Sequence, residues 1–146
     1  MTWADKFISK TIKGFLIVFG LATCLPILLA IDVTIGNQVL FGGLLEATAA
    51  TEPALRHWGV MVGGIGLLMV AAAFRPWLRF EAMLFSLLEK AFMVYLFLGS
   101  MGQPWAKAYQ GAFVLDLTIA VYSLVYFASR HGRPRRWIRQ DGDSGG

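Results

Sequence analysis

Long apolar runs alternate with short polar segments along this chain of 146 residues. Four of the runs approach the roughly 20 predominantly apolar residues that a helix needs to cross a bilayer. The runs cover residues 14–31, 57–74, 82–101 and 111–129. The pattern therefore predicts an all-α protein, an integral membrane four-helix bundle that forms a single domain.

Composition favours the same fold class. Hydrophobic residues make up 57% of the sequence and charged residues 15%, and the mean hydropathy is +0.61. Soluble domains are nearer to about 25% charged, so an ordinary water-soluble domain is disfavoured. The single cysteine, Cys24, cannot form a disulfide within the chain and excludes a thiol relay between two of its own cysteines.

Basic residues gather on one side of the predicted bundle. If the chain crosses the membrane four times, ten of them share the side of both termini, whereas Arg56 and Lys107 lie on the other side. Because basic residues concentrate in cytoplasmic segments, both termini are predicted to be cytoplasmic. The ten residues are Lys6, Lys10, Lys13, Arg75, Arg79, Arg130, Arg133, Arg135, Arg136 and Arg139.

Two flanking segments complete the predicted organisation. Residues 1–13 are expected to form an amphipathic segment along the inner membrane interface before the chain turns into the first helix. Residues 130–146 form a basic cytoplasmic tail, interpreted as an orientation signal that contacts the membrane surface. No aromatic interleaving or fold motif accompanies the basic residues, so no nucleic-acid binding is predicted. The arginines of this surface are Arg133, Arg135, Arg136 and Arg139.

The connection between the first two apolar runs, residues 32–54, is the longest. Its apolar part, Val39 to Leu45, is too short to span, and Gly42-Gly43 would let it bend. We expect it to fold back over the outer end of the bundle as a short interfacial helix, either as a lid or as a plain connector. Within the first helix, Pro26 predicts a kink because proline has no backbone N–H.

The second predicted helix carries a stripe of glycines at Gly59, Gly63 and Gly66. Gly59 and Gly63 form a GxxxG pattern, which allows the backbones of two membrane helices to approach closely. Packing within the chain, against the first or the fourth helix, is the favoured interpretation. A homodimer interface is the alternative.

Three ionisable residues interrupt the last two apolar runs: Glu89, Lys90 and Asp116. An ionisable side chain at the centre of a bilayer costs about 2.5–3.5 kcal/mol on insertion scales. Helical spacing places Lys90 and Asp116 on stripes of small and polar residues that would face each other. Their depths differ by about 5 Å at the helical rise, which a lysine side chain can bridge. The two are predicted to form an ion pair.

Spacing alone leaves Glu89 without a defined partner. The candidates are Arg56 or His57, at the outer end of the second helix, and the tyrosines Tyr95 and Tyr122. The polar set has two interpretations. It is either a structural network that fixes helix register, or the wall of an outward-opening cavity that binds a small ligand, a lipid or quinone head group, or protons.

Other chemistries find little support. No Cys, His, Asp or Glu cluster has metal-ligand spacing. Haem held by two histidines would need His57 and His131, which lie on opposite predicted sides of the membrane. Neither a metal nor another cofactor is therefore predicted. The preferred function is a non-enzymatic membrane protein, an accessory or scaffold subunit or a binder of a lipid or quinone-like ligand. A minimal proton-coupled transporter acting as a dimer is the alternative. An intramembrane enzyme using Glu89 and Asp116 as acid and base ranks lowest.

The layout resembles the small four-helix bacterial membrane proteins of the DoxX-like group and allied families of unknown function. The likeness covers roughly residues 14–129 and rests on a polar first outer loop, the glycine-rich stretch from Arg56 to Gly66, a short inner turn, and Asp116 in the last helix. It implies a bacterial inner-membrane protein, sometimes an accessory subunit of quinone-linked oxidoreductase systems. The Glu89-Lys90 step has no counterpart in this pattern.

Overall fold

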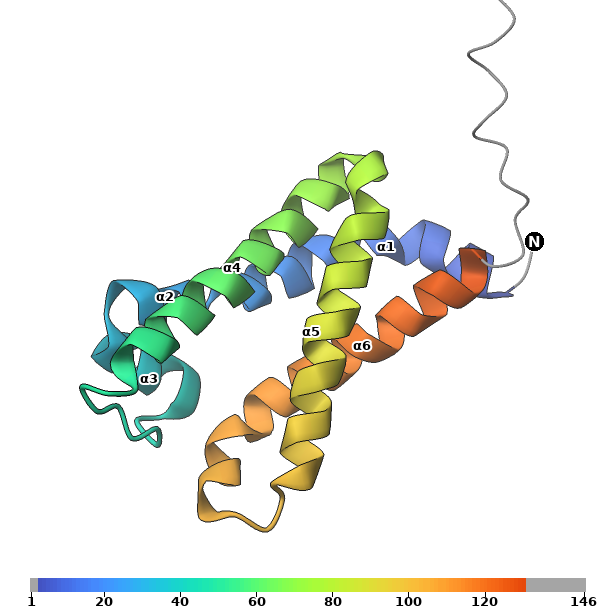
Figure 1. The fold of residues 1–146 in the computed structure, drawn as a ribbon. Coiled ribbons are helices and arrows are strands. Elements are labelled where there is room, and N and C mark those ends of the chain that lie inside the picture. The colour runs from blue at the N-terminus through green and yellow to red at the C-terminus, as the bar shows by residue number, and fades with distance from the viewer. Residues whose placement is uncertain (1–2, 131–146) are drawn as a thin grey trace, which may run out of the picture.

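The computed structural model describes residues 3–130, and every regular element in this range is a helix (Figure 1). Four helical stretches are long and apolar enough to cross a membrane, one for each predicted run. The all-α prediction is therefore confirmed for the described residues. In chain order the elements are α1 (Trp3–Cys24), α2 (Ile27–Ile31), α3 (Val33–Phe41), α4 (Glu52–Phe74), η1 (Pro76–Leu78), α5 (Arg79–Gly99), η2 (Pro104–Tyr109) and α6 (Gln110–Arg130).

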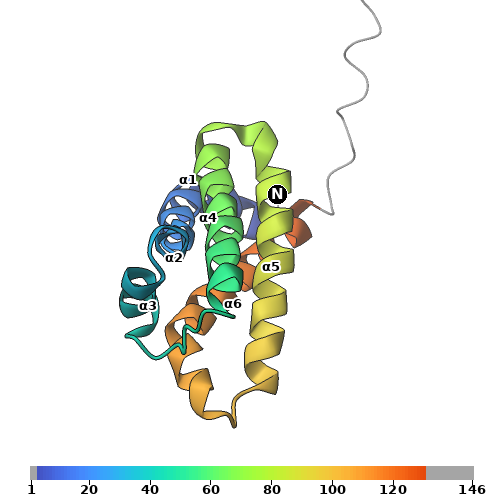
Figure 2. The same cartoon turned by 60° about the vertical axis from the view of Figure 1, so that its left-hand side comes forward.

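The four long helices pack in a ring. α1 makes its broadest contact with α4, α5 packs on α6, and the two pairs meet where α1 contacts α6 and α4 contacts α5 (Figures 1 and 2). The centre of the ring is apolar. Leu16, Met69, Met83 and Ile119, one from each long helix, are fully buried there. This core joins the helices at the end of the bundle that contains both described chain ends.

The N-terminal segment does not turn away from the first helix. α1 is continuous from Trp3, so the predicted turn between residues 1–13 and the first helix is wrong for the described part, whereas its place at a membrane interface stays a prediction. Ile8 and Ile12 are buried in the main core together with Leu16, one helical turn apart each time. Since these apolar positions repeat across Gly14 without interruption, the helix has no reason to stop there.

Pro26 interrupts the first apolar run as predicted. α1 ends at Cys24 and the short α2 resumes at Ile27, so the predicted helix 14–31 is two helices. The carbonyl of Ala22, which cannot receive a bond from Pro26, accepts one from the N–H of Leu25 at 3.2 Å. A tighter turn therefore gives the carbonyl of Ala22 the hydrogen bond that Pro26 cannot donate.

The glycine stripe of α4 lies against α1 and α2. A Cβ at Gly66 would lie 2.6 Å from the backbone nitrogen of Cys24, and a Cβ at Gly59 would lie 2.5 Å from the carbonyl oxygen of Pro26. At Gly63 the nearest atom would be the Ile27 Cβ, at 3.1 Å. The close backbone approach that the stripe permits is thus used inside the chain.

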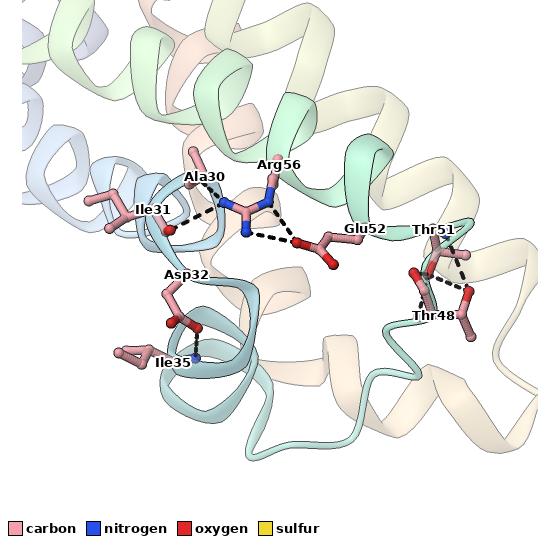
Figure 3. Close-up of polar contacts among 8 residues, drawn as sticks. All are labelled: Ala30, Ile31, Asp32, Ile35, Thr48, Thr51, Glu52 and Arg56. Atoms are coloured by element: carbon pink, nitrogen blue, oxygen red, sulfur yellow. Dashed lines mark hydrogen bonds and ion pairs between the residues drawn. The ribbon is translucent and has the colours of Figure 1, made fainter.

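The long outer connection contains the predicted short helix, α3. The side chain of Asp32 caps it by accepting a hydrogen bond from the N–H of Ile35 at 3.0 Å (Figure 3). It ends at Gly42, whose φ of 60° belongs to the left-handed region, and Gly43 follows at 78°. Only glycine adopts this conformation freely, so the pair turns the chain back toward α4.

Candidate functional site

One buried ion-pair cluster, which we call the triad, joins α5 to α6. The Nζ atom of Lys90 lies 3.0 Å from the Oδ1 atom of Asp116 and 2.8 Å from the Oε2 atom of Glu89. The side chains of Lys90 and Asp116 are only 3% and 6% exposed, and that of Glu89 is 20% exposed. The structure therefore contains the Lys90–Asp116 pair that helical spacing predicts, and adds Glu89 to it.

The predicted partners of Glu89 are wrong. Its carboxylate contacts its own neighbour Lys90, and neither of its oxygens receives an aligned hydrogen bond from the described residues. The tyrosine candidates point elsewhere. Tyr95 is 71% exposed, whereas Tyr122 shares a hydrogen bond with the Thr11 hydroxyl at 2.8 Å and stacks on Phe15.

Arg56 serves a different purpose at the outer end of α4. Its guanidinium donates to the carbonyl oxygens of Ala30 at 2.7 Å and Ile31 at 3.2 Å, and to the carboxylate of Glu52 at 2.7 and 2.9 Å (Figure 3). The carbonyls at the end of α2 have no helical partner, so a cation there is doubly favourable. Its neighbour His57 is exposed. Both residues predicted as partners of Glu89 on α4 therefore lie outside the triad.

Asp116 lines two cavities that lie on either side of it. The first has a volume of about 240 Å³ and is enclosed by α1, α3, α4 and α6, with Lys90 also in its wall; we call it the outer cavity. The second, of about 210 Å³, lies between the outer halves of α5 and α6. Lys90, Asp116 and Thr23 line the outer cavity. The rest of its wall consists of Ala22, Leu25, Pro26, Val39, Leu40, Phe41, Trp58, Val62, Gly111, Ala112 and Leu115.

Aromatic rings hold α3 over the outer cavity. Phe41, at the end of α3, is 5% exposed, and its ring centroid lies 6.1 Å from that of Trp58 and 5.2 Å from that of Tyr109. These rings tie α3 to α4 and to η2. The end of α3 therefore forms part of the wall of the outer cavity, and the choice between a lid and a plain connector stays a prediction.

Two buried hydroxyls near the triad lack hydrogen-bond partners. The Oγ1 atom of Thr23, a residue that is 1% exposed and lines the outer cavity, is one, and the Oγ atom of Ser86 is the other. Most helical hydroxyls here donate to a carbonyl of the preceding turn, as Thr118 does to Val114 at 2.8 Å. Buried polar groups are normally paired, so the Thr23 hydroxyl is available to a hydrogen-bonding ligand of the outer cavity. Spacing could not predict it.

The site combines the apolar wall of the outer cavity, which Asp116 and Lys90 also line, with the charge of the triad behind it. Two carboxylates and one ammonium leave the triad with a formal charge of −1. The apolar walls can hold hydrocarbon, and the polar atoms of Asp116, Lys90 and Thr23 can hold one head group. Among residues 3–130, no three His, Cys, Asp or Glu side chains are placed to hold a metal ion.

Comparisons with protein-family models, with curated proteins and with solved structures returned no match to this chain. The resemblance to the DoxX-like group therefore stays an expectation. The membrane-surface arginines Arg133, Arg135, Arg136 and Arg139 lie outside the described residues.

Proposed function

We propose that this chain is a small, non-enzymatic integral membrane protein that binds a lipid or quinone-like amphiphile in the outer cavity. The observation that carries the proposal is the position of Asp116 and Lys90, an ion pair in the wall of an otherwise apolar space. A volume of about 240 Å³ is below the roughly 300–1,000 Å³ of pockets that enclose a whole small ligand. It suits a head group whose tail stays in the bilayer.

The membrane setting of the proposal rests on four apolar stretches and on charge. Each stretch can span a bilayer by length and hydropathy. Large apolar side chains such as Val18, Leu88 and Val121 are more than half exposed, as lipid contact requires and water disfavours. With the termini in the cytoplasm, the outer cavity opens near the opposite membrane surface. A bacterial inner membrane is the setting that the DoxX-like layout implies.

An accessory subunit of a larger complex and a homodimer are compatible with the same site. In either case the bound amphiphile would be shared with, or delivered to, a neighbouring protein. The glycine stripe does not support the dimer, because Gly59 and Gly66 already face α1 and α2. The proposal therefore places the function in the cavity and not in an interface made by these glycines.

The test fills the cavity. Ala112 lines both cavities, so Ala112→Phe should displace the amphiphile. Val114, on the same helix, is 63% exposed, so Val114→Phe should not displace it. Each variant is purified in a mild maltoside detergent, and the bound mass is read by native mass spectrometry. Gly111→Leu is a second filling variant, because Gly111 lines the outer cavity and a Cβ there meets nothing within 4 Å.

We expect the unsubstituted protein and Val114→Phe to retain an amphiphile and both filling variants to lose it. Circular dichroism establishes that each variant keeps its helix content before binding is compared. A ligand-free unsubstituted protein would refute the proposal. So would retention in Ala112→Phe and Gly111→Leu equal to that in Val114→Phe.

A further inference from the structure

We infer that the outer cavity prefers amphiphiles whose head group is a primary ammonium. This inference rests on the proposed function and names the class of ligand for the same site. It starts from the charge of the triad, in which Glu89 and Asp116 outnumber Lys90 by one. With a neutral ligand, one carboxylate has to take up a proton to remove that excess, because isolated charge is costly in an apolar surrounding. A monovalent cation brings the site to zero.

The positive charge of Lys90 does not repel a cationic head group from this site. Its Nζ atom lies within 3.0 Å of one oxygen on each carboxylate, so its charge is compensated on both sides. The cavity wall beside it contains Asp116, which lines both cavities. Within the described residues, no lysine or arginine other than Lys90 lines either cavity. An anionic head group would meet excess negative charge and is excluded by the same reasoning.

The uncharged parts of the walls also suit a cation. Phe41 and Trp58 line the outer cavity, and Phe97, Tyr109 and Phe113 line the second. The faces of aromatic rings attract cations, most strongly those of tryptophan and where water is excluded. Carboxylate and aromatic groups together therefore favour an ammonium over a neutral or anionic head.

Thr23 distinguishes a primary ammonium from a quaternary one. Its buried Oγ1 atom has no hydrogen-bond partner, and the residue lines the cavity. A primary ammonium has three N–H donors and can supply one to this hydroxyl and another to Asp116. A trimethylammonium group has none. Of these two cationic head groups, only the primary ammonium can donate a hydrogen bond to the Thr23 hydroxyl.

The experiment compares probes with the same ten-carbon chain. Decylammonium, decyltrimethylammonium, decanol and decanoate are each titrated into the protein in maltoside micelles and followed by native mass spectrometry. The reference is Asp116→Asn, which keeps Glu89 and Lys90 as a neutral pair and so avoids an unpaired buried charge. Comparing each probe between the two proteins cancels its partition into the micelle.

We expect Asp116→Asn to weaken decylammonium at least about tenfold, the scale of a hydrogen bond to a charged group, and to leave decanol unchanged. Thr23→Val should also weaken decylammonium about tenfold, because the donor of that hydrogen bond is a charged ammonium, and should spare decyltrimethylammonium. Thr118→Val is the matched control, because that hydroxyl is bonded to its own helix, and it should alter neither.

Equal binding of decanol and decylammonium across both proteins, or tighter decanoate binding, would overturn the inference. If those probes still leave the cavity in Ala112→Phe, the proposed function stands and only the ammonium preference fails. If no probe responds to Ala112→Phe, the proposed function itself fails. Asp116→Asn could also weaken the binding of decanol as much as that of decylammonium. That result would mean that the substitution acts by changing the shape of the cavity and not its charge, and it would overturn the inference.

Discussion

Lys90→Met tests the energetics of the triad. The substitution removes the ammonium that lies 2.8 Å from Glu89 and 3.0 Å from Asp116 and leaves two carboxylates facing each other. Removing one member of a buried ion pair costs about 3–5 kcal/mol, because the remaining charge is left without compensation. Both carboxylate oxygens of Glu89 are buried, so we expect a loss within that range.

The assay is unfolding by sodium dodecyl sulfate in maltoside micelles, which gives the free energy of unfolding. Lys107→Met is the control. That lysine is exposed on η2, so its removal should change stability by less than about 0.5 kcal/mol. The neutral triple variant, Glu89→Gln with Lys90→Met and Asp116→Asn, should recover most of the loss, since neutral replacement of a buried charge set is often tolerated.

The reasoning is refuted if Lys90→Met costs less than about 1 kcal/mol, a loss too small for an uncompensated buried charge. It is also refuted if the triple variant is as unstable as the single one. That second result would show that packing, and not charge balance, sets the stability of this part of the bundle.

Two further predictions concern helix contacts. Gly66→Ala should destabilise the protein by about 1–3 kcal/mol, because its Cβ would lie 2.6 Å from the backbone of α1. Gly64→Ala, whose Cβ would have nothing within 4 Å, should be neutral or slightly stabilising in the same unfolding assay. Equal effects of the two substitutions would contradict the packing of α4 on α1. Arg56→Met should speed hydrogen exchange in α2 and α3, because it removes the donors to the Ala30 and Ile31 carbonyls. Glu52→Gln should change exchange little, since the ion pair between Glu52 and Arg56 is about half exposed. Matching exchange rates in the two variants would show that the carbonyl contacts do not hold α2.

Much of the fold follows from patterns that act over one or two helical turns. Four apolar runs of spanning length gave four long helices, and the proline and the two glycines marked the break and the reversal around α2 and α3. The continuity of α1 could also have been read from the spacing of Ile8, Ile12 and Phe15. The lysines nearby drew the prediction toward a separate surface segment, although their charged ends can lie outside while the helix continues.

The triad was predictable only in part. Lys90 and Asp116 lie on facing stripes at similar depth, so spacing was enough to pair them. Once Lys90 was paired with Asp116, Glu89 was left over, so its partner was sought among Arg56, His57, Tyr95 and Tyr122. The lysine side chain is long enough to bring its Nζ atom back to Glu89, and no periodicity encodes that choice. The same holds for Thr23, whose missing hydrogen bond depends on the packing around it.

The central claim is that an amphiphile occupies the outer cavity, and photolabelling tests it most directly. Ten-carbon probes with a diazirine beside the head group, one with an ammonium and one with a hydroxyl head, are irradiated with the protein and the labelled residues are mapped. We predict labels at Val62 and Leu115, which line the cavity, and their loss in Ala112→Phe. Labels confined to outward-facing residues such as Leu88 and Val121, unchanged by that substitution, would contradict the account.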